Sequence, residues 1–225
     1  YDKLEALQKK GTQGMNNKIL NLSIIHLVVF LFFLFVHTTP TRFTFLNWNV
    51  FLALLPFDFA VIVSIVPSRL LKCLFGVLWL LFFPNTMYMM TDFIHLYAIG
   101  SDLSQAGQYF NYAILATGIF IGVGLGVLSL EIMTRAVFHR HVHLTYFSIT
   151  ALVSVLSALG IYIGRYLRLN SWDIFVNFHV VLRNIAMSMG YHMFTFVILF
   201  AGAQFAVLVV FHYGIRMIKL EQTQA

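Results

Sequence analysis

The sequence is poor in charged residues and in cysteine. Only 10% of its 225 residues are Asp, Glu, Lys or Arg, whereas a soluble domain carries about 25%. Hydrophobic residues make up 60% of the chain and the mean hydropathy is +0.85, so the sequence predicts an integral membrane protein. The single cysteine, Cys73, excludes an internal disulfide. We expect the net charge of +6 to flank membrane spans rather than to bind nucleic acid.

Long apolar runs predict an all-α polytopic protein with about six transmembrane helices. A helix needs about 20 apolar residues to cross a bilayer core, and the candidate spans are 18–37, 47–66, 68–83, 109–134, 144–164 and 191–214. We expect a single membrane domain over 15–217. The polar residues 1–14 are interpreted as a tag remnant or a cytoplasmic extension, and 218–225 as a cytoplasmic tail.

Basic residues predict the orientation, because Lys and Arg are enriched in cytoplasmic loops. With the N-terminus inside, seven basic residues lie on the inner side and four on the outer side: Lys18, Arg69, Lys72, Arg135, Arg140, Arg216 and Lys219 against Arg42, Arg165, Arg168 and Arg183. Both termini are therefore predicted to be cytoplasmic, and the protein is predicted to lie in the cell (cytoplasmic) membrane. Three of the outer exceptions lie within 165–183, where something must compensate for them.

Two predicted spans carry glycines at helical spacing. Gly118, Gly122 and Gly126 recur every four residues on one span, and Gly160 and Gly164 do so on the next. Small residues let membrane helices approach closely. We expect these stripes to serve packing within the protein, with a dimer interface as the lesser alternative.

A polar stripe interrupts the apolar sequence "FFPNTMYMMTDFIHLY". Asn85, Tyr88, Asp92 and His95 recur at i, i+3, i+7 and i+10, which predicts one face of a helix at the outer interface. The carboxylate can orient the imidazole for acid–base chemistry. The two groups can also supply metal ligands or form a structural hydrogen bond. The spacing alone leaves these alternatives open.

A second polar segment, "GRYLRLNSWD", is predicted on the same side of the membrane. Arg165 and Arg168 are three residues apart and are predicted to share one helix face. Asn170 and Asp173 follow them, at the start of an amphipathic interfacial helix predicted over about 172–188. Clustered arginines suit phosphate or carboxylate. We expect both segments to form one pocket, in which an acid such as Asp92 pairs with an arginine.

Metal and cofactor signals are weak. Asp92, His95 and His179 are the candidates for a metal site, and no cofactor is indicated. The histidines of "HRHVH", residues 139–143, are expected in an exposed basic loop of the inner side.

Two further ionisable pairs have simple structural interpretations. Glu131 and Arg135 are four residues apart, which predicts an ion pair on a helix surface. His26 and Asp58 lie at similar depths in the first two spans, so a structural hydrogen bond between them is the favoured interpretation, with a proton-coupled role as the alternative.

The two outer segments resemble a bacterial multi-pass membrane family catalogued as domain of unknown function 1361. The resemblance covers Met15 to about residue 217 and rests on Phe83-Pro84-Asn85, Thr91-Asp92, His95-Leu96, Gly164-Arg165, Arg168 and Asn170 to Asp173. It implies a bacterial cytoplasmic-membrane protein, and it indicates that these positions belong to one pattern without naming an activity.

Three kinds of function fit the sequence. The first is binding or transport of an anionic lipid headgroup or small anionic solute in an outer-facing polar pocket. The second is an intramembrane lipid-modifying or metal-dependent hydrolytic enzyme that uses Asp92 and His95. The third is a structural or accessory subunit that has another membrane subunit as its partner.

Overall fold

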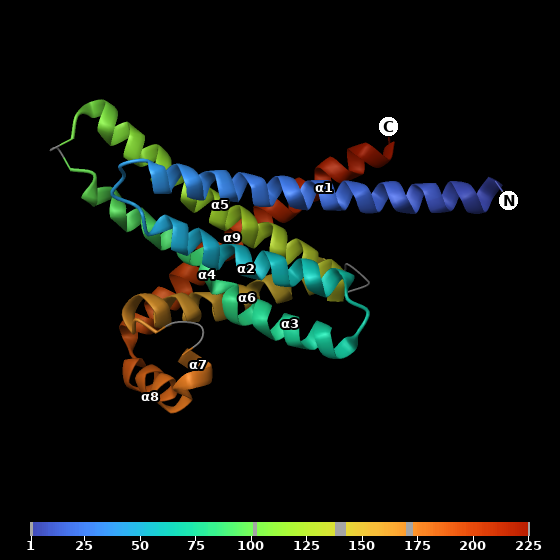
Figure 1. The fold of residues 1–225 in the computed structure, drawn as a ribbon. Coiled ribbons are helices and arrows are strands. Elements are labelled where there is room, and N and C mark those ends of the chain that lie inside the picture. The colour runs from blue at the N-terminus through green and yellow to red at the C-terminus, as the bar shows by residue number, and fades with distance from the viewer. Residues whose placement is uncertain (1, 101–102, 138–142, 170–172, 225) are drawn as a thin grey trace. The chain divides into compact units, whose positions relative to one another are not determined.

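The computed structural model describes residues 2–100, 103–137, 143–169 and 173–224, and these are helical without a strand. The helices in chain order are α1 (Asp2–Thr38), α2 (Leu46–Ile65), α3 (Arg69–Phe82), α4 (Pro84–Tyr88), the 3₁₀-helix η1 (Met89–Ala98), α5 (Gln105–Val137), α6 (His143–Tyr166), α7 (Asp173–Val176), α8 (Phe178–Ser188) and α9 (Tyr191–Gln224) (Figure 1). The chain divides into two units, Tyr1–Asn47 and Trp48–Ala225.

The first unit is built on α1, and the loop after α1 folds back onto it. The Asn47 side-chain amide donates to the Phe33 carbonyl oxygen over 3.3 Å. Within α1, the His26 ring Nδ1 lies 3.0 Å from the Leu22 carbonyl oxygen, so the imidazole bonds its own helix. A bond between His26 and Asp58 stays a prediction.

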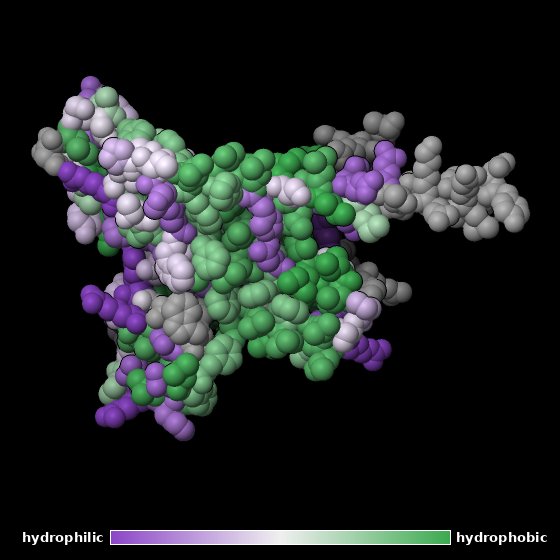
Figure 2. Space-filling model, viewed as in Figure 1, coloured by the Kyte–Doolittle hydropathy of each residue, from purple (hydrophilic) through white to green (hydrophobic). Residues whose placement is uncertain are grey.

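The prediction of six membrane-crossing helices is confirmed. Within the described residues, the helical segments long and apolar enough to span a bilayer number six: Gln13–Thr38, Leu46–Ile65, Arg69–Ala98, Gln105–Val137, Thr145–Tyr166 and Tyr191–Ile218. Apolar side chains cover most of the visible helix surface, as contact with lipid requires (Figure 2). The protein is therefore a multi-pass membrane protein.

The third span differs from the expectation that it ends at residue 83. Helical structure continues past Pro84 because this proline occupies the first position of α4, where its missing N–H costs no hydrogen bond. The segment lies only partly at the surface, since Thr86, Met87, Met89 and Asp92 are buried whereas Tyr97 is 78% exposed. In the polar stripe Asp92 is buried and the other three residues are half-buried.

The glycine stripes make this packing possible. A Cβ atom on Gly122 would lie 2.3 Å from Met89 Cγ, and one on Gly126 would lie 2.6 Å from Thr86 Oγ1. On α6, a Cβ on Gly160 would lie 2.7 Å from Pro84 Cγ. The expectation of packing within the protein is confirmed at these three positions, because each glycine admits a residue of α4 or η1.

The segment after α6 forms short helices rather than a span. α7 and α8 lie beside each other with a break at Asn177 (Figure 1). α8 has 11 residues and is about 16 Å long at 1.5 Å per residue, which is too short to cross a bilayer core. After α8, α9 returns along α6 as an extensively packed partner.

Candidate functional site

The centre of the candidate site is the carboxylate of Asp92 on η1, which is fully buried. Asn49 on α2 donates its side-chain amide to Asp92 Oδ2 over 2.7 Å. The second oxygen, Oδ1, lies 3.5 Å from Arg165 Nη2 and 3.9 Å from His95 Nε2. These are ion-pair distances rather than well-formed hydrogen bonds. Asp92 therefore joins α2, η1 and α6 through charge and one short hydrogen bond.

Arg165, in the last turn of α6, holds the same network from the other side. Its Nη1 donates to the Tyr88 hydroxyl oxygen over 2.8 Å, and its Nη2 donates to the Thr91 carbonyl oxygen over 2.9 Å. The guanidinium carbon also lies 5.1 Å from the centre of the Tyr88 ring, within cation–π range. Arg165 is thus positioned by α4 and η1 and compensates the buried carboxylate, as the local break in the charge rule suggested.

Local backbone geometry explains why these groups meet. Side chains three residues apart are eclipsed in a 3₁₀-helix, so Asp92 and His95 of η1 point the same way. On α6, Gly164 leaves room for the Tyr88 ring, because a Cβ there would already lie 3.9 Å from Tyr88 Cε2. A larger residue at position 164 would meet the ring that Arg165 holds.

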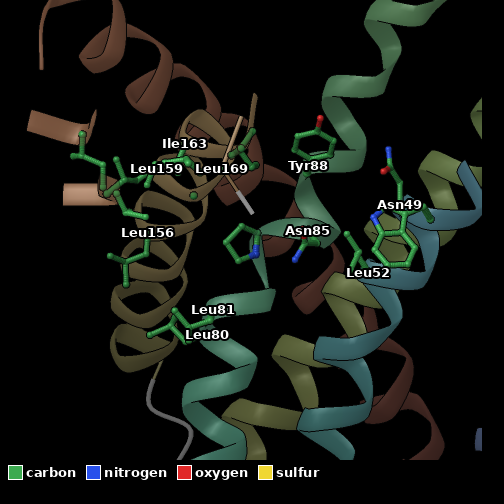
Figure 3. A pocket seen from close by; sticks show the side chains of 17 residues that line it. Asn49, Leu52, Leu80, Leu81, Asn85, Tyr88, Leu156, Leu159, Ile163 and Leu169 are labelled. Carbon is green, nitrogen blue, oxygen red and sulfur yellow. The ribbon is translucent and has the colours of Figure 1, made fainter. Parts of the chain in front are cut away.

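A pocket of about 440 Å³ adjoins this network, within the usual range of about 300–1,000 Å³ for small-molecule sites. Figure 3 shows its lining, whose 17 residues come from α2, α3, α4, α6, α8 and the turn after α6. Twelve of the 17 are apolar, two are glycine and three are polar: Asn49, Asn85 and Tyr88. The pocket is therefore apolar with a small polar wall.

The polar wall and the buried charges are parts of one arrangement. Asn49 and Tyr88 line the pocket, while their partners Asp92 and Arg165 stand behind them and do not. Because the Tyr88 oxygen accepts from Arg165, its own O–H remains available to donate to a ligand. The third polar residue, Asn85, donates to the Phe82 carbonyl oxygen over 3.0 Å. The wall can thus present a hydrogen-bond donor backed by a positive charge.

The structure brings together five of the residues predicted for the site: Asn85, Tyr88, Asp92, His95 and Arg165. Arg168 is separate, and the prediction that it shares a helix face with Arg165 is wrong. α6 ends at Tyr166 and Arg168 has φ 56°, so helical spacing no longer applies there. Arg168 is exposed and has no hydrogen bond or ion pair with the described residues.

The other predicted site residues lie on other helices or outside the described part of the chain. Asp173 begins α7 and is half-buried, and Asn170 lies outside the described residues. His179 is exposed on α8. Within the described part of the chain, no three His, Cys, Asp or Glu side chains form a group that could hold a metal ion. The "HRHVH" loop lies outside that part apart from His143, which begins α6.

Sequence reasoning missed Asn49 and the apolar body of the pocket. Asn49 was not predicted because it lies near a helix start, two residues after another asparagine and 43 residues from Asp92. The only available signal was its position among apolar neighbours in the second span. The leucines and isoleucines of the pocket carry no signal, since any membrane helix contains such residues.

Comparison with known proteins gives one result at the level of the family. Residues 48–207 match the model of a protein family of unknown function (DUF1361), and this range covers well over half of the chain. No curated protein and no solved structure gives a significant match. The matched range contains Asn49, Tyr88, Asp92 and Arg165, so the network and its pocket lie within the family's shared region. The chain, itself a multi-pass membrane protein, belongs to the DUF1361 family.

Proposed function

We propose that this protein binds a membrane lipid with an anionic headgroup, with the headgroup at Tyr88 and Asn49 and an acyl chain in the apolar pocket. The observation that carries the proposal is the division of one pocket into a polar wall and a larger apolar body. We place the protein in the bacterial cytoplasmic membrane, with this pocket facing outward, in accordance with its charge distribution.

The polar wall favours an anionic group. The Tyr88 hydroxyl accepts from Arg165, which polarises its O–H toward an incoming oxygen atom. Arg165 lies behind Tyr88, so its positive charge acts on the pocket through the hydroxyl that it holds. Hydrogen bonds to charged groups are roughly twice as strong as neutral ones, which gives phosphate an advantage over a neutral headgroup.

The apolar body favours a lipid over a small anionic solute. A soluble anion would gain nothing from the leucine and isoleucine side chains, whereas each buried CH₂ group of an acyl chain contributes about 0.8 kcal/mol. Lining residues also reach the membrane-facing surface, since Trp48 is 55% exposed, Leu80 39% and Leu156 40%. A lipid can therefore enter sideways from the bilayer.

Native mass spectrometry of the purified protein tests this proposal with phosphatidylglycerol and phosphatidylcholine of identical acyl chains. We expect preferential retention of phosphatidylglycerol. Tyr88→Phe removes the donor and should weaken retention about tenfold, since a hydrogen bond to a charged group contributes about 1.5–3 kcal/mol. Leu159→Trp fills the pocket and should reduce retention of both lipids.

Matched controls come from the same elements. Tyr97→Phe on η1 and Leu152→Trp on α6 change residues that are 78% and 60% exposed and lie outside the pocket, and we expect wild-type retention. Equal retention by Tyr88→Phe and wild type would refute the headgroup assignment. Displacement of the lipid by millimolar sn-glycerol 3-phosphate would show that the ligand is a small solute instead.

A further inference from the structure

A second buried charged group lies at the other end of α6, where α5 ends and α6 begins. Glu131 on α5 is 5% exposed and its Oε1 contacts His212 Nδ1 on α9. Its Oε2 accepts from Arg135 Nη2 over 2.9 Å, which confirms the predicted i,i+4 pair. The predicted surface pair is thus one half of a buried site.

Further titratable groups face this site from the packed helices. The Tyr146 ring on α6 stacks on His212, with centroids 3.5 Å apart, and its hydroxyl interacts with Glu131. On α9, Tyr213 follows His212 with rings 5.1 Å apart, and Arg216 lies one turn further. The Arg135 side chain is 44% exposed, so the site borders the water at this end. A carboxylate and an imidazole in contact beside water can take up and release a proton.

A row of buried polar residues leads from Tyr146 into the bundle. Thr150, Ser154 and Ser157 follow it at intervals of four, four and three residues, on one face of α6, and each is 0–1% exposed. The Ser154 and Ser157 hydroxyls have no hydrogen-bond partner among the described residues. We call these three residues the polar seam.

Gln204 on α9 lies at the level of the middle of the polar seam. Tyr146 stacks on His212 and Tyr162 lies against Phe196, so α6 and α9 run antiparallel. Ser154 lies midway between the two tyrosines, and Gln204 lies midway between His212 and Phe196, at the same level. Gln204 is fully buried and neither atom of its amide group has a partner within the described chain.

This concentration of unsatisfied polar atoms calls for a ligand. A buried polar group without a partner costs about 1–3 kcal/mol, and lone Ser or Gln residues in membrane helices normally bond a neighbouring helix. Buried hydroxyl and amide groups at one level of the bundle supply the kind of polar partners, two to four in number, that a buried water molecule requires. Water is therefore the ligand whose size and chemistry suit the polar seam.

The same face of α6 continues into the pocket. Ile161 and Gly164 follow Ser157 at intervals of four and three residues, and both line the pocket. Beyond them lie Tyr88 and Asn49, the latter bonded to Asp92. From Tyr146 to Gly164 the helix rises about 27 Å, close to the roughly 30 Å thickness of a bilayer core.

We propose that the polar seam is a proton path between the Glu131–His212 pair and the pocket, which holds water only when no lipid occupies it. A proton from water at the α5–α6 end binds the Glu131–His212 pair. Each hydroxyl or water along the seam then accepts one proton and releases another, so that none is changed by the passage. Water in the unoccupied pocket accepts the last proton and carries it to the other side of the membrane. Buried carboxylate and histidine residues in membrane spans commonly form such relays.

Proton flux into liposomes tests the path. The full chain is reconstituted with entrapped pyranine, and a potassium gradient with valinomycin drives protons inward. We expect a flux at least about tenfold above protein-free liposomes, and a reduction of about tenfold in Glu131→Gln and Gln204→Leu, as a modest added barrier produces. Ser154→Ala on the seam should slow the flux, whereas Ser148→Ala on the exposed side of α6 should not.

The serine pair decides the outcome if Glu131→Gln or Gln204→Leu fails to fold, as judged by gel filtration. Flux by wild type at the protein-free level would overturn the proposal. So would equal flux in Ser154→Ala, Ser148→Ala and wild type, because conduction would then not follow the polar seam. The liposomes consist of phosphatidylcholine, the lipid that we expect the pocket to retain less, and lipid retention is measured separately by mass spectrometry, so the proton path and the lipid site can fail separately.

Discussion

Replacement of Arg165 by glutamine tests whether the Asp92 network holds the fold together. The change removes the donors to Tyr88 and Thr91 and the positive charge 3.5 Å from Asp92. Two hydrogen bonds contribute about 1 kcal/mol each, and breaking a buried ion pair costs about 3–5 kcal/mol in total. Asp92 is fully buried but Arg165 is partly exposed, so we expect the free energy of unfolding to fall by about 4 kcal/mol, near the middle of that range.

A double-mutant cycle with Asp92→Asn separates the two contributions. The asparagine is neutral, so Arg165→Gln in that background should lose only the bonds to Tyr88 and Thr91, about 2 kcal/mol. The expected coupling between positions 92 and 165 is therefore about 2 kcal/mol, measured by reversible unfolding in mixed detergent micelles. Arg168→Gln, at an exposed arginine without partners in the described chain, should change stability by less than about 0.5 kcal/mol.

Additive effects of the two substitutions, within about 0.5 kcal/mol, would refute this reasoning. The buried carboxylate would then not depend on Arg165 for its charge compensation. An equally large loss of stability in Arg168→Gln would also refute it. Both arginines would then belong to the site, as their three-residue spacing in the sequence suggested.

Two further predictions concern packing and topology. Gly160→Ala should destabilise the protein by about 1–3 kcal/mol, because the added Cβ would lie 2.7 Å from the rigid ring of Pro84. A Cβ at Gly124 would have nothing within 4 Å, so Gly124→Ala should be neutral or slightly stabilising. Equal unfolding midpoints of the two variants would contradict this. If both termini are cytoplasmic, a membrane-impermeant maleimide should label Ser68→Cys only from the inner side and Ser104→Cys only from the outer side, each in a Cys73→Ser background; the reverse pattern would invert the orientation.

The network at Asp92 was partly predictable because electrostatics constrains membrane segments strongly. An acid within an apolar stretch needs a partner, and excess arginines on the outer side need one too, which linked Asp92 with Arg165. The same argument included Arg168, where it failed because α6 ends two residues earlier. Charge pairing predicts that Asp92 has a partner, but backbone geometry decides which arginine reaches it.

The sequence by itself determined the number and helical nature of the spans, because about 20 consecutive apolar residues and satisfied backbone groups are local requirements. It also determined the Glu131–Arg135 pair, which one helical turn brings together. Only the tertiary structure decided that Asn49 bonds Asp92, that His212 contacts Glu131 from 81 residues away, and that Gln204 lies level with Ser154. Such contacts depend on how helices pack side by side. The periodic glycines indicate helix faces that can approach closely, but only the structure shows that α4 and η1 are the elements that they admit.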